Sequence, residues 1–285
     1  MTMNHKKAVF LTCCVALLWS TFGLLVKLID WPSPAIAGGR SIIAALILTP
    51  FILKSQNKKI TPYVISGALC YAAFNYCFSM STKLATAAIA IAMQYTAPVY
   101  VSILAWIFLR EKISKSDVIC IFLVLCGMFL FMLDGTSSGS ALGKFLAVLN
   151  GIFFAGMSFS LRLQRHGNPV MSMYIGNIIS GIVGFPTLIN AGLPDASSLG
   201  FVVLVGILCA VTYALYAIAS TGLTALETVL LPIIEPVMNP IWVFLIVGET
   251  PGLLSIIGMG IVLVSVTTRV IAGLKNETQP RKSQV

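Results

Sequence analysis

A single carboxylate inside an apolar run is the strongest candidate for chemistry in this sequence. Glu235 lies in TVLLPIIEPVMNPIW, residues 228–242, next to prolines that recur every four residues, Pro232, Pro236 and Pro240. A carboxylate deep in hydrocarbon is costly and usually has both a function and a partner. We therefore expect Glu235 to bind a substrate amine or to exchange a proton. The alternative is a structural Glu that hydrogen-bonds a neighbouring helix, beside prolines that only kink the chain.

Five residues share one face of the helix expected here. They are Thr228, Pro232, Glu235, Asn239 and Trp242, separated by four, three, four and three positions. This spacing places them in one stripe, which we expect to face the interior of a bundle. Each proline lacks an N–H, so the carbonyl group four residues before it loses its usual donor. Bare carbonyls at membrane depth are tolerated only where water, protein or ligand satisfies them, so we expect the stripe to line a central cavity.

Amphipathic side chains at similar depth in other apolar runs are candidates to line the same cavity. They are Trp19, Tyr71, Asn75, Tyr76, Gln94, Tyr95, Asn150, Tyr174, Asn177, Tyr213 and Tyr216. Together they would make a mostly apolar pocket with a few polar groups, which is the usual composition of a ligand site. For any one of them alone, a helix-packing hydrogen bond or an interfacial anchor explains its presence equally well.

One arginine lies deeper in an apolar run than a charge normally does. Arg40 comes about two turns after the start of the second run. It could attract a substrate carboxylate, pair with Asp30 or Glu249, or extend toward the lipid headgroups. We expect a structural or gating role for it. The helix breaks expected to act with it are at Pro98, Pro232, Pro236 and Pro240.

The composition is that of a chain embedded in a membrane. Of its 285 residues, 58% are hydrophobic and 9% are charged, whereas about a quarter of a soluble domain is charged. The expected fold is an all-α membrane protein, because apolar runs of about 20 residues span a bilayer as helices. Ten such runs lie at about 8–28, 34–53, 61–81, 85–109, 116–133, 142–163, 169–190, 198–220, 223–247 and 252–272. No small-residue cleavage site closes the first run, which we therefore interpret as an uncleaved helix.

Lysine and arginine gather on alternate loops of this topology. If the N-terminus is cytoplasmic, 14 of the 18 basic residues fall inside, and 4 fall outside or at the outer ends of helices. Basic cytoplasmic loops are typical of membrane proteins. We expect both termini to be cytoplasmic, including a polar tail at 275–285. We interpret the net charge of +9 as an orientation signal, not as a site for nucleic acid.

The two halves of the sequence repeat one another. Residues 86–111 align with 224–249 at a constant shift of 138, and this register places Ala97 over Glu235. Five expected helices per half is an odd number, so the second half must be inverted in the membrane. Inverted repeats of this kind occur in secondary transporters, with the substrate site near the midplane where the halves meet.

A duplicated motif carries a resemblance to a known family. An alanine, a Pro-Val pair and a helix-terminal Glu recur as Ala87, Pro98-Val99 and Glu111, then as Ala225, Pro236-Val237 and Glu249. With Trp19-Ser20 and Arg40, the chain resembles the drug/metabolite transporter superfamily, in its EamA branch of ten-helix proteins. The resemblance implies two EamA-like five-helix repeats, at 8–133 and 142–272. It also implies transport of small metabolites such as amino acids or amines, mostly outward across a bacterial inner membrane. Alternating access with proton antiport is the mechanism we expect.

Other classes of protein fit less well. An intramembrane enzyme lacks its usual residues, since there is no HExxH pattern and both histidines, His5 and His166, fall in expected loops. No Gly-rich nucleotide-binding loop indicates an ATP-driven pump. No charged ring or carbonyl filter marks a channel, although an uncoupled facilitator for small metabolites stays open as the alternative. We expect no enzyme activity, no cofactor and no metal. The expected partners are a small-molecule substrate, protons and membrane lipid, with the oligomeric state left open.

Overall fold

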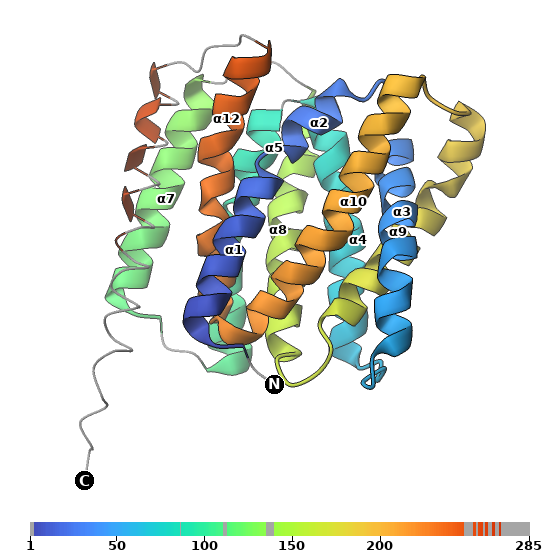
Figure 1. The fold of residues 1–285 in the computed structure, drawn as a ribbon. Coiled ribbons are helices and arrows are strands. Elements are labelled where there is room, and N and C mark those ends of the chain that lie inside the picture. The colour runs from blue at the N-terminus through green and yellow to red at the C-terminus, as the bar shows by residue number, and fades with distance from the viewer. Residues whose placement is uncertain are drawn as a thin grey trace.

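Every regular element that the structure shows is a helix. The computed structural model describes residues 3–85, 87–110, 113–134 and 140–247, together with the scattered residues 253, 254, 256–258, 260, 261, 264, 265 and 268. Over these residues there is no strand, which confirms the expected all-α class there. The long helices run side by side in a bundle, and the N-terminus lies at one end of it (Figure 1).

The helices of the first half follow the expected runs closely. They are α1 (His5–Trp19), α2 (Phe22–Leu28), α3 (Ser33–Lys54), α4 (Pro62–Leu84), α5 (Ala87–Gln94), α6 (Ala97–Leu104), the π-helical turn η1 (Ala105–Leu109) and α7 (Lys115–Asp134). The expected runs 8–28 and 85–109 are each divided, between α1 and α2 and between α5 and α6. Glu111 lies outside the described residues.

The second half is built in the same way. Its elements are α8 (Ala141–Leu163), α9 (Val170–Ala191), α10 (Ala196–Ala219), the 3-10 turn η2 (Ser220–Gly222), α11 (Ala225–Leu230), the 3-10 turn η3 (Leu231–Ile233) and α12 (Ile234–Val247). Most of the expected run 252–272 lies outside the described residues, as do Glu249 and the tail at 275–285.

A proline accompanies the division of one helix in each half. Pro98 is in the first turn of α6, where a missing N–H costs little because the first amides of a helix have no intrahelical partner. Pro232 lies in η3, between α11 and α12. The face expected from Thr228 to Trp242 is therefore not carried by one continuous helix. The 3-10 turn η3 interrupts the α-helix between Thr228 and Trp242.

The packing of the helices follows the internal repeat. In the repeat, α1, α3 and α4 of the first half correspond to α8, α9 and α10 of the second. The contact of α4 with α8 is matched by that of α10 with α1, and the contact of α4 with α9 by that of α10 with α3. The contact of α3 with α9 joins two equivalent helices. This pairwise exchange is the packing expected of two related halves around a pseudo-two-fold axis.

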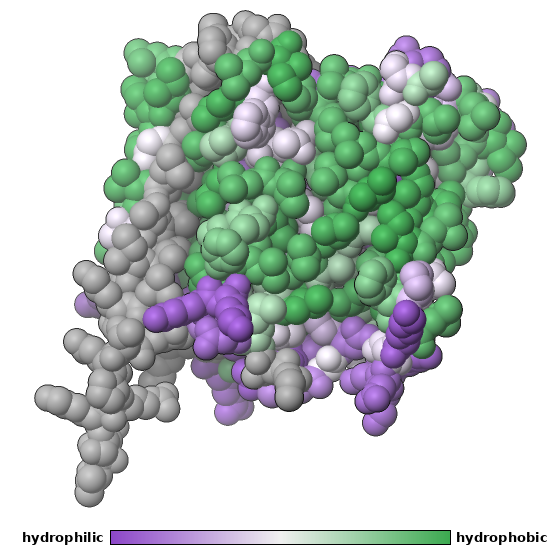
Figure 2. Space-filling view, viewed as in Figure 1, coloured by the Kyte–Doolittle hydropathy of each residue, from purple (hydrophilic) through white to green (hydrophobic). Residues whose placement is uncertain are grey.

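The surface of the bundle suits a bilayer. Five stretches of the described chain are long and apolar enough to cross a membrane, namely His5–Leu28, Ser33–Lys54, Ala141–Leu163, Val170–Ala191 and Ala196–Gly222. Figure 2 shows apolar side chains over most of the visible flank and hydrophilic ones gathered at the end where the N-terminus lies. The flank can therefore face lipid while this end faces water.

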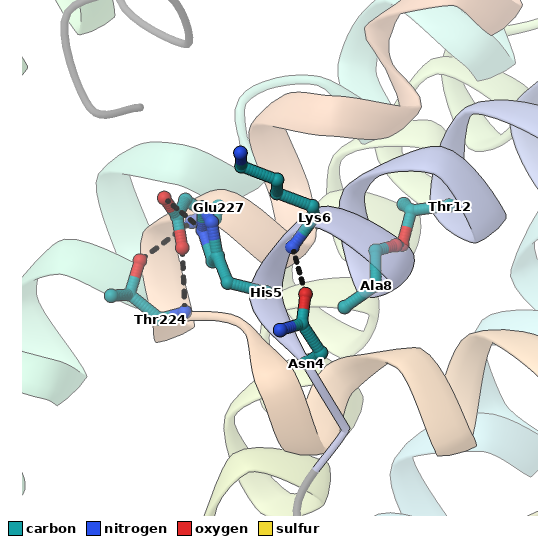
Figure 3. Close-up of polar contacts among 7 residues, drawn as sticks. All are labelled: Asn4, His5, Lys6, Ala8, Thr12, Thr224 and Glu227. Carbon is teal, nitrogen blue, oxygen red and sulfur yellow. Dashed lines mark hydrogen bonds and ion pairs between the residues drawn. The ribbon is translucent and has the colours of Figure 1, made fainter. Parts of the chain in front are cut away.

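The N-terminal segment, residues 3–8, is fastened to the start of α11 (Figure 3). The backbone N–H of Met3 donates to Thr221 Oγ1 at 3.3 Å, and His5 Nε2 lies 3.1 Å from Glu227 Oε1. Glu227 also forms a capping box with Thr224 at the first turn of α11. The segment thus ties the beginning of the chain to the beginning of the helix pair that carries Glu235.

Replacing His5 by Ala is expected to loosen this segment and to leave the cap of α11 in place. A partly exposed pair of this kind contributes about 0–1 kcal/mol. Amide hydrogen exchange in residues 3–8 should therefore rise by at most about fivefold, since a factor of ten corresponds to 1.4 kcal/mol. Lys6→Ala is the control, because Lys6 is exposed. Equal exchange in the two variants would show that the contact of His5 with Glu227 does not hold the segment.

Candidate functional site

Glu235 lies where the divided helices of the two halves meet. It is the second residue of α12, directly after η3, and only 3% of it is exposed. Tyr95 Oη donates to Glu235 Oε2 at 2.9 Å, and Gln94 Nε2 donates to the same oxygen at 3.3 Å. Both donors come from the end of α5 and the turn that follows it. Among the described residues, no Lys, Arg or His forms an ion pair with Glu235.

Two tyrosines bind the carbonyl groups that the prolines deprive of their helical donors. Pro236 has no N–H for the carbonyl of Pro232, which accepts from Tyr95 Oη at 2.6 Å. Pro232 has none for the carbonyl of Thr228, which accepts from Tyr216 Oη at 2.9 Å. Hydroxyl groups of the protein therefore satisfy both carbonyl groups, which is one of the expected possibilities.

Tyr95 therefore has one hydroxyl proton for two acceptors. Its hydroxyl oxygen is within hydrogen-bond distance of both the Pro232 carbonyl and the Glu235 carboxyl group, and a phenol has a single O–H. When Glu235 is ionised, the carbonyl and the carboxylate compete for that proton. When Glu235 is protonated, the carboxyl group can donate to the phenol oxygen, and the phenol can donate to the carbonyl. A proton on Glu235 thus changes the hydrogen bonding at the helix break.

Asn150 on α8 orients Gln94. Asn150 Nδ2 donates to the backbone of α5 at 3.1 Å and to Gln94 Oε1 at 3.4 Å. The amide oxygen of Gln94 is thereby taken, and its nitrogen is free to donate to Glu235. The neighbouring Gly151 permits this approach of α8, because a Cβ atom there would lie 2.4 Å from the carbonyl oxygen of Met93.

Several of the predicted lining residues form a buried aromatic cluster. The cluster consists of four predicted residues, Trp19, Tyr71, Tyr213 and Tyr216, and of Phe74 and Phe154, which were not predicted. Each is at most 5% exposed. The Trp19 ring centroid lies 4.8 Å from that of Tyr213 and 4.9 Å from that of Tyr216. Trp19 Nε1 donates to Thr212 Oγ1 at 2.8 Å. Tyr216 connects this cluster to the break in the helix of Glu235, through its bond to Thr228.

Asn239 and Trp242 contact a residue that sequence reasoning did not select. Asn239 Nδ2 donates to the carbonyl of Ser20 at 2.8 Å, and Trp242 Nε1 donates to Ser20 Oγ at 2.8 Å. Ser20 lies in the division between α1 and α2. The available signal was the polar Ser-Thr pair in the middle of the first apolar run. Pro240 lies between these two donors on α12, and its side chain is outside the described part.

Arg40 belongs to a second polar cluster, formed with Asn75 and Ser41. The residue is 2% exposed, and its Nη2 donates to the side-chain oxygen and to the carbonyl oxygen of Asn75 on α4. Asn75 Nδ2 in turn donates to Ser41 Oγ at 2.7 Å. Arg40 neither pairs with Asp30 nor extends to the headgroups, because its guanidinium group is buried against α4. Glu249, the other partner considered, is outside the described residues.

Other predicted residues lie apart from Glu235. Tyr71 Oη donates to Asn177 Oδ1 at 3.1 Å, and Tyr76 Oη donates to the backbone of α9 at 2.7 Å. Tyr174 Oη is 3.4 Å from Thr49 Oγ1. Tyr174 and Asn177 line a cavity of about 430 Å³ between α3 and α9. Tyr76 and Tyr174 therefore join α3, α4 and α9, and the structure does not bring them to the carboxyl group.

Comparison with known proteins identifies the family of the chain. The EamA-like transporter family matches two segments of the chain, residues 6–133 and 141–270. The chain belongs to this family. One solved structure, described as "Crystal structure of protein", is similar to the chain with a TM-score of 0.78 at 16% identity. That likeness covers 96% of this chain and 100% of the other, and concerns the fold alone. No curated protein matches the sequence.

Membership of the EamA-like transporter family confirms the resemblance to drug/metabolite transporters. This EamA-like protein is a multi-pass membrane transporter with a small-molecule substrate. In this transporter Glu235 is a buried acid held by two neutral donors at the meeting point of the two divided helices.

Proposed function

We propose that this transporter exports small organic metabolites, such as amino acids or amines, across the bacterial inner membrane in exchange for protons. The supporting observation is the position of Glu235, buried at a helix break and bound by Tyr95 and Gln94 from the other half. A titratable acid that lies in one repeat and is hydrogen-bonded by the other can couple the relative movement of the repeats to its protonation. The carboxylate also has no cationic partner within the described chain, so it can bind a cationic group of a substrate.

The proposed coupling acts through the hydroxyl proton of Tyr95. With Glu235 protonated, Tyr95 donates to the Pro232 carbonyl and holds η3 against the turn after α5. With Glu235 ionised, the carboxylate is the stronger acceptor, because hydrogen bonds to charged groups are about twice as strong. The Pro232 carbonyl then loses Tyr95 as its donor, and the contact between the two broken helices weakens. Proton uptake and release thereby favour different arrangements of the two halves.

We also propose that ten helices form two inverted repeats, and that both termini are cytoplasmic. The connections at the end of the bundle that holds the N-terminus include α3 to α4 and α8 to α9 (Figure 1). They carry Lys58, Lys59 and Arg165, and the hydrophilic surface in Figure 2 gathers at the same end. Basic loops remain on the cytoplasmic side, which supports this orientation. Alternating access would then expose Glu235 to each side in turn.

The proposed function is tested by following metabolites and protons together. Cells that over-express the protein should accumulate an amine or amino acid in the medium and lose it from the cytoplasm, relative to cells with an unrelated membrane protein. In liposomes containing purified protein, transport of that compound should accelerate when a pH gradient is imposed. Equal rates with and without the gradient would show an uncoupled facilitator. Unchanged metabolite levels in medium and cytoplasm would contradict export.

A further inference from the structure

A groove in the flank of the bundle opens toward the membrane. It has a volume of about 350 Å³ and lies between the C-terminal halves of α3 and α10, with the first residue of α9 in its lining. Its lining includes the buried side chains of Leu48 and Ala210, and also Phe51 and Val211, which are 67% and 44% exposed. The flank over α10 and α3 is apolar in Figure 2. The groove is therefore a hollow in the surface that faces lipid.

The length and the lining of the groove suit one acyl chain. The groove extends along α3 from Ile47 to Ser55 and along α10 from Ala210 to Ile218. At a rise of about 1.5 Å per residue, each stretch is about 12 Å long, close to the ~15 Å of hydrocarbon in one leaflet. Ser55 and Asn168 are the polar residues of the lining. Both lie where α3 ends and α9 is about to begin, so the groove has one polar end.

Basic residues lie at this polar end. Asn168 Nδ2 donates to Ser55 Oγ at 3.1 Å and to the carbonyl of Asn57 at 3.0 Å, which joins the connection between α8 and α9 to that between α3 and α4. These connections and the last residue of α3 contain no Asp or Glu, and their basic residues are Lys54, Lys58, Lys59 and Arg165. All four are exposed, and within the described chain none of them forms an ion pair. An anion can therefore neutralise charge at this end.

The other cavity on α3 lacks this combination. The cavity of about 430 Å³ between α3 and α9 also contains exposed apolar side chains, such as Leu46 and Phe185. Its lining includes no residue of the two basic connections. An apolar hollow and a basic rim thus coincide at the groove between α3 and α10.

We propose that this groove is a binding site for an anionic phospholipid. One acyl chain lies between α3 and α10, and the basic residues of the two connections bind the phosphate at the polar end. Clusters of Lys and Arg beside membrane helices bind anionic headgroups in this way. A phospholipid fits both parts of the site at once, because its chain supplies apolar contact and its headgroup supplies negative charge. A free phosphate or a second apolar helix supplies only one of these.

A lipid in this position contacts both halves of the transporter. The helix α3 belongs to the first half, and α9 and α10 belong to the second. The site itself depends on neither the substrate nor proton coupling. It requires only the groove and the charge beside it.

The first test compares two phospholipids that differ in the headgroup. Purified full-length protein in detergent is titrated with dioleoylphosphatidylglycerol or dioleoylphosphatidylcholine, and bound lipid is counted by native mass spectrometry. A basic residue near the surface strengthens binding of an anionic lipid by about fivefold, so phosphatidylglycerol should bind at least about tenfold tighter. Equal affinity of the two lipids overturns the site. Displacement of the lipid by an equal concentration of inorganic phosphate also overturns it, since the acyl chain would then contribute nothing.

A double variant tests the charge at the polar end. In Lys54→Gln/Lys58→Gln the preference for phosphatidylglycerol should fall by about fivefold for each charge removed. The unfolding temperature should stay unchanged, because both side chains are exposed. Lys6→Gln/Lys7→Gln is the control, since it removes two exposed lysines of α1 at the same end of the bundle and should keep the preference. An equal loss in the two variants would show that only the total charge matters, and the site would be wrong.

A second variant tests the hollow. Ala214→Phe places a ring in the groove, so binding of both lipids should weaken by at least about tenfold, the effect of exposing two methylene groups. Val203→Phe is the control, because Val203 lies on α10 outside the groove and is 39% exposed. The unfolding temperature without lipid verifies that both variants are folded. Unchanged lipid binding in Ala214→Phe overturns the site. Conversion of a dimer to a monomer by this variant, with lipid binding intact, would show that the groove holds a second copy of the chain.

These measurements are independent of the proposed function, since lipid binding is followed in detergent without a substrate or a pH gradient. A headgroup preference without metabolite export would support the lipid site and contradict the exporter. Metabolite export without a headgroup preference would contradict the lipid site and leave the exporter in place.

Discussion

Glu235→Gln is expected to lower metabolite transport by roughly a hundredfold and to abolish its response to a pH gradient. Gln has nearly the same size and still accepts from Tyr95, but it cannot take up a proton or neutralise a cationic group. In the proposed function Glu235 contacts a cationic group of the substrate, and removing one member of such a buried ionic contact costs about 3–5 kcal/mol, which corresponds to a factor of more than one hundred. Initial rates in liposomes, with the gradient present and absent, measure both effects.

The matched control is Glu227→Gln, eight residues earlier on α11. Glu227 is partly exposed and bonded to His5 and Thr224, so its loss should change transport by less than about fivefold. Tyr95→Phe extends the comparison, because it keeps the acid and removes the hydroxyl proton. This variant should still transport, with a weaker response to the gradient. Unchanged transport and pH response in Glu235→Gln would exclude the carboxyl group from the mechanism.

Gly184→Ala is expected to lower the free energy of unfolding by about 1–3 kcal/mol, the usual cost of overpacking. A Cβ atom at position 184 would lie 2.6 Å from the Cα atom of Gly38, 2.7 Å from Tyr76 Oη and 2.9 Å from the carbonyl oxygen of Pro34. Most of these atoms are backbone, so α3 and α9 must separate to make room. Close packing of small residues is a main source of association between membrane helices.

Thermal unfolding in detergent measures this effect. For a chain of this size, the expected fall in unfolding temperature is about 2–10 °C. Gly200→Ala is the control, since a Cβ atom there would meet nothing within 4 Å. That substitution should be neutral or stabilising, because Ala is the better helix former by about 1 kcal/mol. If both variants unfold at the wild-type temperature, the contact of Gly38 with Gly184 does not limit the approach of the two helices.

The sequence by itself determined the class of the protein, the repeat and the position of its acid. A chain with 58% hydrophobic residues and apolar runs of spanning length has few alternatives to a bundle of membrane helices. The prolines also predicted breaks, because a missing N–H is a local property of the chain. For the same reason, the sequence indicated which carbonyl groups needed new donors. Divisions occur at Pro98 and Pro232, whereas α12 continues through Pro236 and Pro240 without the breaks expected there.

Only the tertiary structure decided which side chains donate to these carbonyl groups. Tyr95 and Glu235 lie 140 positions apart, and their contact depends on how the two divided helices cross. The partner of Arg40 was likewise decided by packing, since α4 brings Asn75 to it and Asp30 forms no ion pair with it. Periodicity shows which face of a helix is polar, but not which neighbouring helix that face meets. For this reason the sequence did not show that Tyr174 faces the cavity between α3 and α9. Nor did it mark Ser20 as a site residue, although Ser20 accepts hydrogen bonds from Asn239 and Trp242.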